Sequence, residues 1–399
     1  MSDLDILFSA HCIGPRTVPN RLVAQPMEGG DGGEGGGVSA RTLQRYERLA
    51  DGGWGLVFVE AASVTDTSLG RLRGLAFTEA TARSYEALVR GFRERNPQAL
   101  LMIQLTHSGR QTHPALDRTS ICPNPPALMR YLATEEIERI RLQFVGAALL
   151  AEKLGFDGLD LKLCNGYFGM EMLRPANTRA DRWGGAFENR TRFVAEAYQE
   201  IRSRLCTPGL VIGSRLGFAE RLRGGFGARG PDSDEYDPTE PLALIRLLHR
   251  VGADYVNITG EVTDTRDYAD LRPEERRVTS LLAERLTEDL LRREHLGMTV
   301  IGSGYSELRQ EAAGIAAARL SAGHTDLVGF GRQILADPLY PAKLRRGEPP
   351  DLCVGCWSCA ELMLGQRHTG CVAHDRYYRR QLRELRRARE AARHTPGGQ

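Results

Sequence analysis

The sequence predicts an α/β protein, a (β/α)8 barrel followed by a short cysteine-rich extension. Eight short apolar runs occur along the chain, and segments long enough for a helix separate them. Strands that are apolar on both faces are typical of parallel sheets covered by helices, and eight such strands can close into a barrel. The predicted strands are residues 21–27, 55–61, 99–107, 158–164, 210–217, 255–260, 298–304 and 326–332.

A doubly wound open sheet is the competing interpretation. It requires a GxGxxG turn after its first strand and an acidic residue about 20 positions later. The stretch 29–37, GGDGGEGGG, follows the first run but has too many glycines and no helix directly behind it. It favours a flexible lid or loop over the barrel mouth, with a phosphate cradle as the second interpretation.

Composition and charge exclude several classes of protein. Of the 399 residues, 41% are hydrophobic and 26% are charged, as expected for a soluble globular protein. A net charge of +2 implies no general attraction to nucleic acid or to a membrane surface. No apolar run approaches the roughly 20 residues of a membrane span, and the first residues lack the features of a signal peptide. We therefore expect a cytoplasmic protein.

The fourth predicted strand ends in a turn that leads to a phenol group. Apolar residues alternate along 159–163, and Asn165 and Gly166 then break the strand. Tyr167 follows directly, just beyond the strand end. Barrels of this kind carry their chemistry at the carboxyl ends of the strands, so Tyr167 is a candidate catalytic residue.

The next segment carries a family resemblance. Residues 179–193 read RADRWGGAFENRTRF, which resembles the RxDRWGGxxENRxRF signature of the Old Yellow Enzyme family of flavin oxidoreductases. The resemblance extends over about residues 6 to 374. It implies a (β/α)8 barrel that binds FMN at its mouth and catalyses an FMN-dependent oxidation or reduction.

Several strand ends match positions at which the family contacts FMN. In relatives, the glutamine matched by Gln104 hydrogen-bonds the pyrimidine edge, and the arginine matched by Arg215 faces negative charge on the reduced ring. Paired glycine turns after the seventh and eighth strands are typical of the phosphate pocket of flavin-binding barrels. The candidate FMN-binding residues are Pro26, Met27, Glu28, Ala61, Gln104, Arg215, Gly302, Ser303, Gly304, Gly331 and Arg332.

Glu28 departs from the family pattern. Relatives usually have a small or sulfur-bearing residue here, in contact with the edge of the flavin ring. A carboxylate at this place would disfavour an anionic reduced flavin, whereas a side chain turned into solvent would have no such effect. Both interpretations remain open, but a cysteinyl-flavin bond is excluded at this position.

The candidate catalytic residues are Lys162, Asn165 and Tyr167. Relatives place a histidine, and a second histidine or an asparagine, at the first two positions, where they bind a substrate carbonyl. Their tyrosine protonates the substrate α carbon while the flavin delivers hydride to the β carbon, and a phenol suits that task. Lys162 is a second departure. As an ammonium it favours an anionic substrate over a cationic one; as a neutral amine it would be a base for dehydrogenation.

Four cysteines are clustered after the barrel. Cys353, Cys356, Cys359 and Cys371 have the spacing C-x2-C-x2-C-x11-C, which favours a 4Fe-4S cluster over the two separated knuckles typical of zinc. A zinc site or no metal are the alternatives. The spacing resembles the iron–sulfur branch of the family, which includes trimethylamine dehydrogenase and 2,4-dienoyl-CoA reductase. The complete prediction is a TIM barrel with a short C-terminal 4Fe-4S cluster-binding extension.

We expect an FMN barrel over 1–340, a cluster segment over 341–375 and a basic helical tail over 376–399. Relatives of the iron–sulfur branch continue into a dinucleotide-binding portion, for which this chain has no room. We therefore expect electrons to be exchanged with a separate protein, such as a ferredoxin, a flavodoxin or a reductase. The arginine-rich tail would dock an acidic carrier; a solvated helix or a contact within a homo-oligomer is the alternative.

The leading functional interpretation is an ene-reductase that reduces an activated C=C bond of a small substrate, with electrons arriving through the cluster. The first alternative is an amine or C–C dehydrogenase, or a demethylase, that passes electrons out through the cluster. The second alternative is an electron-transfer subunit that has no substrate of its own.

Overall fold

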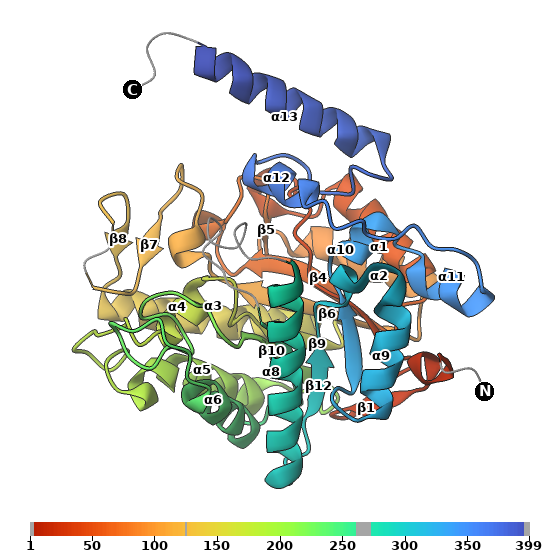
Figure 1. Ribbon diagram of the computed structural model, residues 1–399. Helices are drawn as coiled ribbons and strands as arrows, with labels where there is room; N and C mark the ends of the chain where they lie inside the picture. Colours follow the sequence, from red (N-terminus) through yellow and green to blue (C-terminus); the bar gives the residue numbers. More distant parts are fainter. Residues whose placement is uncertain (1–3, 124–125, 261–272, 395–399) are drawn as a thin grey trace.

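A closed barrel of parallel strands forms the body of the protein. The computed structural model describes residues 4–123, 126–260 and 273–394 (Figure 1). The barrel strands are β3 Leu22–Ala24, β4 Leu56–Ser63, β6 Leu100–Thr106, β9 Gly158–Leu161, β10 Val211–Gly217, β11 Tyr255–Thr259, β12 Thr299–Gly302 and β13 Leu327–Phe330. Because β3 pairs in parallel with both β13 and β4, the sheet closes on itself. Each predicted strand overlaps one of these eight, and only β4 extends beyond its predicted range, by two residues, so the predicted barrel is confirmed.

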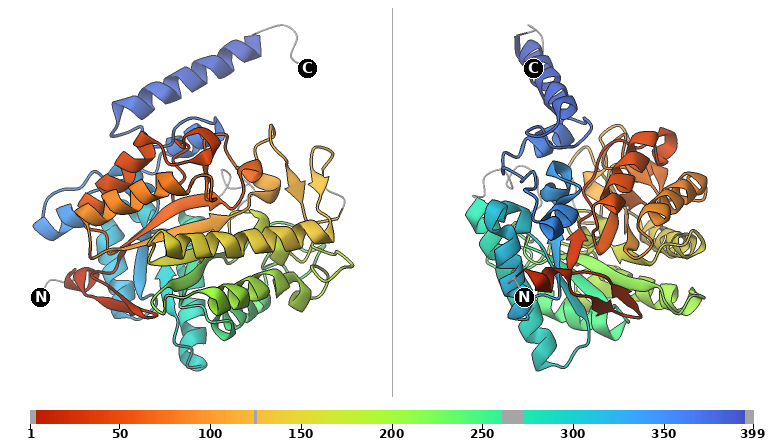
Figure 2. Two further views of the ribbon diagram at one scale, coloured as in Figure 1. Left: turned by 180° about the vertical axis from the view of Figure 1, so that it is seen from behind. Right: turned by 90° about the vertical axis from the view of Figure 1, so that its right-hand side faces the viewer.

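Helices surround the barrel and cover the outer face of the sheet (Figures 1 and 2). The strands are buried on both faces; every residue of β4, β6 and β10 is buried. This explains why the sequence shows continuous apolar runs rather than strict alternation. The main outer helices are α1 Ala40–Asp51, α2 Ala82–Arg95, α3 Thr134–Lys153, α5 Phe187–Arg204, α6 Thr239–Arg250, α8 Pro273–Arg293 and α9 Ala312–Ser321.

A short N-terminal hairpin closes the interior of the barrel. Its strands are β1 His11–Ile13 and β2 Arg16–Val18. Ile13 and Val18 are fully buried and belong to the same apolar cluster as the inward-facing side chains of the barrel strands. This cluster fills the interior, so a ligand can enter only beyond the strand ends.

The glycine-rich stretch after β3 is a packed loop. Asp31 is buried and forms a salt bridge of 2.9 Å with Arg45 of α1. The backbone of Gly36 has a φ of 81° and packs so closely that a Cβ atom there would lie 2.6 Å from the Ala76 nitrogen. The predicted loop is present, but it is packed rather than a flexible lid, because the glycines permit close packing.

The C-terminal extension lies against one end of the barrel and then leaves it. It contains α11 Tyr340–Arg346, α12 Ser358–Leu364 and α13 Arg376–His394. Leu382 and Leu385 are buried beside α12, whereas the rest of α13 projects away from the barrel (Figures 1 and 2). None of the helices within the described parts of the chain has the length and apolar character to span a membrane.

A buried ion pair supports the segment that follows Tyr167. That segment forms the short helix α4 Phe168–Leu173, and Arg174 is its C-cap. The Arg174 guanidinium donates two hydrogen bonds, of 2.8 and 2.6 Å, to the Glu220 carboxylate. The side chains are 5% and 0% exposed. Two buried charges in this geometry hold the segment in place, because neither is tolerated without its partner.

Replacing Arg174 with leucine should therefore destabilise the protein strongly. The Glu220 carboxylate would stay buried without its guanidinium, which costs about 3–5 kcal/mol in comparable pairs. Urea unfolding followed by circular dichroism measures this. Arg223→Leu is the matched control, because its salt bridge to Asp232 joins side chains that are 73% and 85% exposed and should contribute little. Equal stability of the two variants would contradict the assigned role of the buried pair.

Candidate active site at the mouth of the barrel

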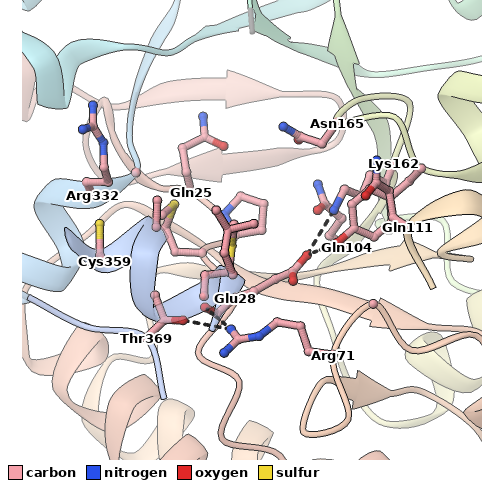
Figure 3. Close-up of a pocket in the computed structure, with 18 of the residues that line it drawn as sticks. Gln25, Glu28, Arg71, Gln104, Gln111, Lys162, Asn165, Arg332, Cys359 and Thr369 are labelled. Atoms are coloured by element: carbon pink, nitrogen blue, oxygen red, sulfur yellow. Dashed lines mark hydrogen bonds and ion pairs between the residues drawn. The ribbon is translucent and has the colours of Figure 1, made fainter. Parts of the chain in front are cut away.

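A cavity of about 400 Å³ lies at the carboxyl ends of the strands. Its wall combines strand ends of the barrel with the C-terminal extension, so most predicted site residues meet in one place (Figure 3). The predicted site residues that line it are Pro26, Met27, Glu28, Gln104, Lys162, Asn165, Tyr167, Arg215, Ser303, Gly304, Gly331, Arg332 and Cys359.

Two predicted flavin contacts do not line this cavity. Ala61 borders a smaller hollow of about 10 Å³, whose lining also includes Glu28 and Tyr167. Gly302 lies behind the cavity wall, where a Cβ atom would collide with the carboxylate of Glu284. The glycine is therefore required by packing at this position.

A tight turn presents Tyr167 to the cavity. Asn165 and Gly166 have φ angles of 59° and 60°, in the left-handed region that asparagine and glycine tolerate best. Tyr167 follows as the N-cap of α4, and both Tyr167 and Asn165 line the cavity. The Asn-Gly pair seen in the sequence thus explains the placement of the phenol.

Glu28 points toward the catalytic candidates and not into solvent (Figure 3). Its Oε1 atom accepts a hydrogen bond of 2.7 Å from the Tyr167 hydroxyl and lies 3.3 Å from Lys162 Nζ. The side chains of Glu28 and Lys162 are 18% and 5% exposed. Burial opposes ionisation of Glu28, but Lys162, Tyr167 and Arg71 outweigh it and lower the pKa of its carboxyl. Glu28 is therefore a carboxylate at neutral pH.

The same contacts act on the phenol. Burial, followed by the charge and the hydrogen bond of Glu28, raises the pKa of Tyr167 well above its ordinary value. The Lys162 ammonium also lies 3.3 Å from the centroid of the Tyr167 ring. Tyr167 is therefore a protonated phenol at neutral pH, as a proton donor must be.

Hydrogen bonds fix the amide groups of Gln25 and Asn257 and the guanidinium group of Arg215 beside the cavity. Gln25 Oε1 accepts from Arg215 Nη1 at 3.1 Å and from Asn257 Nδ2 at 2.8 Å. Gln25 Nε2 donates in return to Asn257 Oδ1 at 2.9 Å. Arg215 Nε is buried and has no hydrogen-bond partner within the described structure. That unsatisfied donor, together with the charge of Arg215, suits an acceptor on a bound ligand.

A second network holds Gln104. Its Nε2 atom donates to Asp160 Oδ1 at 2.8 Å, and the Tyr255 hydroxyl donates to Asp160 Oδ2 at 2.9 Å. Burial raises the pKa of Asp160 to about 6, against the opposing effect of these hydrogen bonds. Asp160 thus fixes the orientation of the Gln104 amide, and its Oε1 atom and second N–H group can meet a donor and an acceptor on a ligand.

One end of the cavity has the features of a phosphate site. Ser303 and Gly304 come from the turn after β12, and Gly331 and Arg332 come from the turn after β13. Gly304 has a φ of 93°, and a Cβ atom on Gly331 would come within 3.1 Å of Met27 Sδ. Both glycines line the cavity; a side chain would be strained by the backbone at 304 and would crowd Met27 at 331.

The residues present therefore fit FMN. Arg215 and Gln104 would hold the polar edge of the isoalloxazine ring, and the two glycine turns with Arg332 would hold the phosphate. The buried unsatisfied donor of Arg215 and the close glycine turns are the observations that carry this fit.

The four predicted cluster ligands differ in exposure. Cys353 is buried, Cys359 and Cys371 are partly buried, and Cys356 is exposed. Burial raises the pKa of Cys359 to about 11, against the opposing charge of Arg332. Within the described parts of the chain, no three His, Cys, Asp or Glu side chains are grouped to hold a metal ion. In a 4Fe-4S cluster the cysteines bind different irons, so all four thiols suit such a cluster by their chemistry, and the metal site remains a prediction.

The cysteine segment nevertheless forms one wall of the cavity. Cys359, Met363 and Thr369 all line it. Thr369 also donates its backbone N–H to the Gly29 carbonyl at 2.7 Å, next to Glu28. The extension is therefore attached directly to the turn that carries Glu28.

Sequence reasoning missed several residues of this site. Arg71 donates to Thr369 Oγ1 at 2.8 Å and to the Glu28 carbonyl at 3.3 Å, joining the extension to the barrel (Figure 3). Trp357 contacts two guanidinium groups, those of Arg276 and Arg332, whose carbons each lie 3.9 Å from the centroid of its ring. In the sequence, only the position of Trp357 inside the cysteine motif indicated that it belongs to the site. Arg71 and Arg276 look like any other arginine in a loop or a helix.

Curated proteins with similar sequences include oxidases, dehydrogenases and reductases. An NADH oxidase of Thermoanaerobacter brockii is 27% identical over 374 residues, covering 89% of this chain and 53% of that protein. A dimethylamine dehydrogenase of Hyphomicrobium is 26% identical, covering 89% and 48%. A cinnamate reductase of Clostridium sporogenes is 24% identical, covering 90% and 56%. The chain thus spans about half the length of these relatives.

Solved structures share the fold. A 2-naphthoyl-CoA reductase in complex with 2-naphthoyl-CoA matches with a TM-score of 0.79 at 21% identity, covering 95% of this chain and 58% of that one. Morphinone reductase in complex with tetrahydroNAD matches with a TM-score of 0.66 at 22% identity, covering 87% and 92%. The model of the NADH:flavin oxidoreductase / NADH oxidase family matches residues 6–351. The chain therefore belongs to this family of Old Yellow Enzyme-like flavin oxidoreductases.

Proposed function

We propose that this protein is an FMN- and 4Fe-4S-dependent ene-reductase, which reduces an activated C=C bond with electrons relayed through the cluster. The position of Cys359 carries the proposal, because this cysteine lines the same cavity as Tyr167, Arg215 and the glycine turns. A cluster bound by this segment would lie next to the flavin, so the distance for electron transfer between the two would be short.

The catalytic roles follow from the placement of the side chains. Bound FMN would supply hydride to the β carbon of the substrate. Tyr167 would donate its phenolic proton to the α carbon, and Asn165 and Lys162 would orient the electron-withdrawing group. Tyr167 is suited to this because it is protonated at neutral pH and lines the cavity.

The charge of the cavity favours an anionic substrate. Among its described lining residues, six are arginine or lysine and two are glutamate. The FMN phosphate would compensate part of this excess near Arg332, and positive charge would remain toward Arg71 and Arg118. This remaining positive charge would bind a carboxylate on the substrate, or a phosphate on a group that a thioester joins to the substrate.

The electron donor we propose is a separate acidic redox protein. In α13, Arg376, Arg380, Arg383 and Arg387 are exposed and follow one another at helical spacing, on the face opposite the buried Leu382 and Leu385. This basic face begins five residues after Cys371 in the chain. An acidic carrier docked there would approach the cysteine segment.

The reverse reaction is the alternative. A dimethylamine dehydrogenase is among the relatives, and the pairing of Lys162 with Glu28 leaves less positive charge to repel an amine. Anaerobic mixing separates the hypotheses: an ene-reductase oxidises its reduced flavin when an enone is added, whereas a dehydrogenase reduces its oxidised flavin when an amine or saturated substrate is added. If neither class changes the flavin spectrum, the electron-transfer subunit is favoured.

Replacing Cys371 with serine should remove iron and leave FMN bound. Anaerobically purified protein should contain about four iron atoms per chain, and the variant far fewer, with unchanged flavin absorbance. Iron analysis and visible spectra measure this. Cys206→Ser is the matched control, because Cys206 is exposed and outside the motif. Iron-free wild type, or a variant with full iron, would overturn the cluster proposal.

Tyr167→Phe should lower kcat for an enone by about 10²–10⁴-fold, because only the phenolic proton donor is removed. Flavin absorbance and flavin reduction should stay at wild-type levels, since the ring of the side chain is retained. Stopped-flow reoxidation of the reduced enzyme measures the loss. A variant with wild-type reoxidation would remove Tyr167 from the proton transfer.

Lys162→Met should lower kcat/KM for an anionic α,β-unsaturated acid by at least about tenfold, the effect of losing one hydrogen bond to a charged group. The neutral methyl ester of the same acid is the matched control and should lose much less. Cinnamate and methyl cinnamate serve as the pair, assayed at two salt concentrations. Equal losses for both substrates would show that substrate charge is not recognised by Lys162.

A further inference from the structure

The two departures from the family pattern meet in space. Glu28 follows β3 and Lys162 follows β9, and β4 and β6 lie between these strands in the barrel. Their side chains nevertheless form an ion pair of 3.3 Å, and both contact Tyr167. Two unusual residues that compensate each other's charge behave as one unit, because either alone would leave a buried charge at the site.

Without Glu28, the charge of Lys162 would make Tyr167 a poorer reservoir of the proton that it has to donate. Its ammonium lies 3.3 Å from the centroid of the Tyr167 ring, and a cation so close stabilises the phenolate form. Glu28 opposes this in two ways: its carboxylate offsets the ammonium charge, and its Oε1 atom accepts the phenolic proton in a hydrogen bond of 2.7 Å.

We propose that Glu28 and Lys162 form a positioning unit that keeps Tyr167 protonated while leaving a cation beside it. This deepens the proposed ene-reductase function and rests on it. In the protonation step, the Tyr167 O–H bond breaks and a C–H bond forms at the substrate. Lys162 then stabilises the phenolate until water returns a proton to the oxygen, and Glu28 holds that proton until the next substrate binds.

Other charged groups around the phenol do not replace this unit. Arg71 approaches from the loop before β5 Leu75–Ala76, and its charge acts in the direction opposite to that of Glu28. Cys164, beyond β9, acts in the same direction as Glu28 but more weakly. Glu60 of β4 faces Arg45, and burial is the main effect on its own ionisation. Glu28 is thus the main charged group that favours the protonated phenol.

Tyrosine labelled with ¹³C at Cζ allows the proposal to be tested by NMR on the FMN-bound, oxidised protein without substrate. Tyr167→Phe assigns the signal. In the wild type we expect Tyr167 to remain a phenol throughout the alkaline range in which the protein stays folded, because burial and Glu28 raise its pKa well above the ordinary value. In Glu28→Gln it should titrate at least about one pH unit lower than in the wild type. Tyr167 that stays a phenol over the same range in Glu28→Gln would overturn the proposal.

Three further variants separate this role from general damage to the site. Glu28→Asp keeps the carboxylate and should restore the phenol at high pH. Lys162→Met should not lower the pH at which Tyr167 titrates. A lower titration pH would contradict the assigned effect of the lysine. In Glu28→Gln/Lys162→Met the shift should be smaller than in Glu28→Gln, because the two residues act on each other.

If the Glu28→Gln variant does not fold, the double variant still tests the proposal. Tyr167 of the double variant should then titrate below Tyr167 of Lys162→Met, since the carboxylate is the difference between them. Equal values would overturn the proposal. In the active enzyme, the alkaline limb of the kcat/KM profile should move to lower pH in Glu28→Gln. If the wild type reduces no enone, the proposed function fails, while the NMR titration still decides the role of Glu28.

Discussion

Hydrogen bonding of β3 to both β13 and β4 is the constraint on which the rest of the structure depends. It joins the first barrel strand to the last and brings all eight carboxyl ends to one rim. Residues separated by more than 130 positions, such as Glu28 and Lys162, become neighbours only through this closure. The hairpin of β1 and β2 fills the opposite end, so the rim is where a ligand can bind.

The chemistry of the rim is governed by the burial of charge. Glu28, Lys162 and Arg71 are all partly or fully removed from water, and each has partners at hydrogen-bonding or ion-pair distance. In such surroundings a group is held in one protonation state by its neighbours more than by bulk pH. The neighbours are supplied by three different strand ends or loops, which makes the site a product of the whole barrel.

The barrel could be predicted from the sequence because its signal is local. Each strand is a continuous apolar run, and the Asn165-Gly166 turn before Tyr167 is visible in two letters. The contacts of Glu28 could not be predicted, because the sequence left two directions open and only the closed barrel places Lys162 beside it. The packing of the glycine-rich stretch could not be predicted for the same reason. Glycines permit both mobility and tight packing. Ala76, whose contact with Gly36 shows tight packing here, lies 40 positions away in the chain. Arg71 gave no signal at all, since its partners in the extension are nearly 300 positions distant.

The extension serves two purposes with the same residues. Between Trp357 and Thr369 the chain carries part of the cysteine spacing and also supplies one side of the substrate cavity. An insertion or deletion in this stretch would alter the distance between Cys359 and Cys371 and the width of the cavity at once. Changes in the range of accepted substrates are therefore expected to arise on the barrel side, in the loop after β6, where sequence length can vary without disturbing the cysteines.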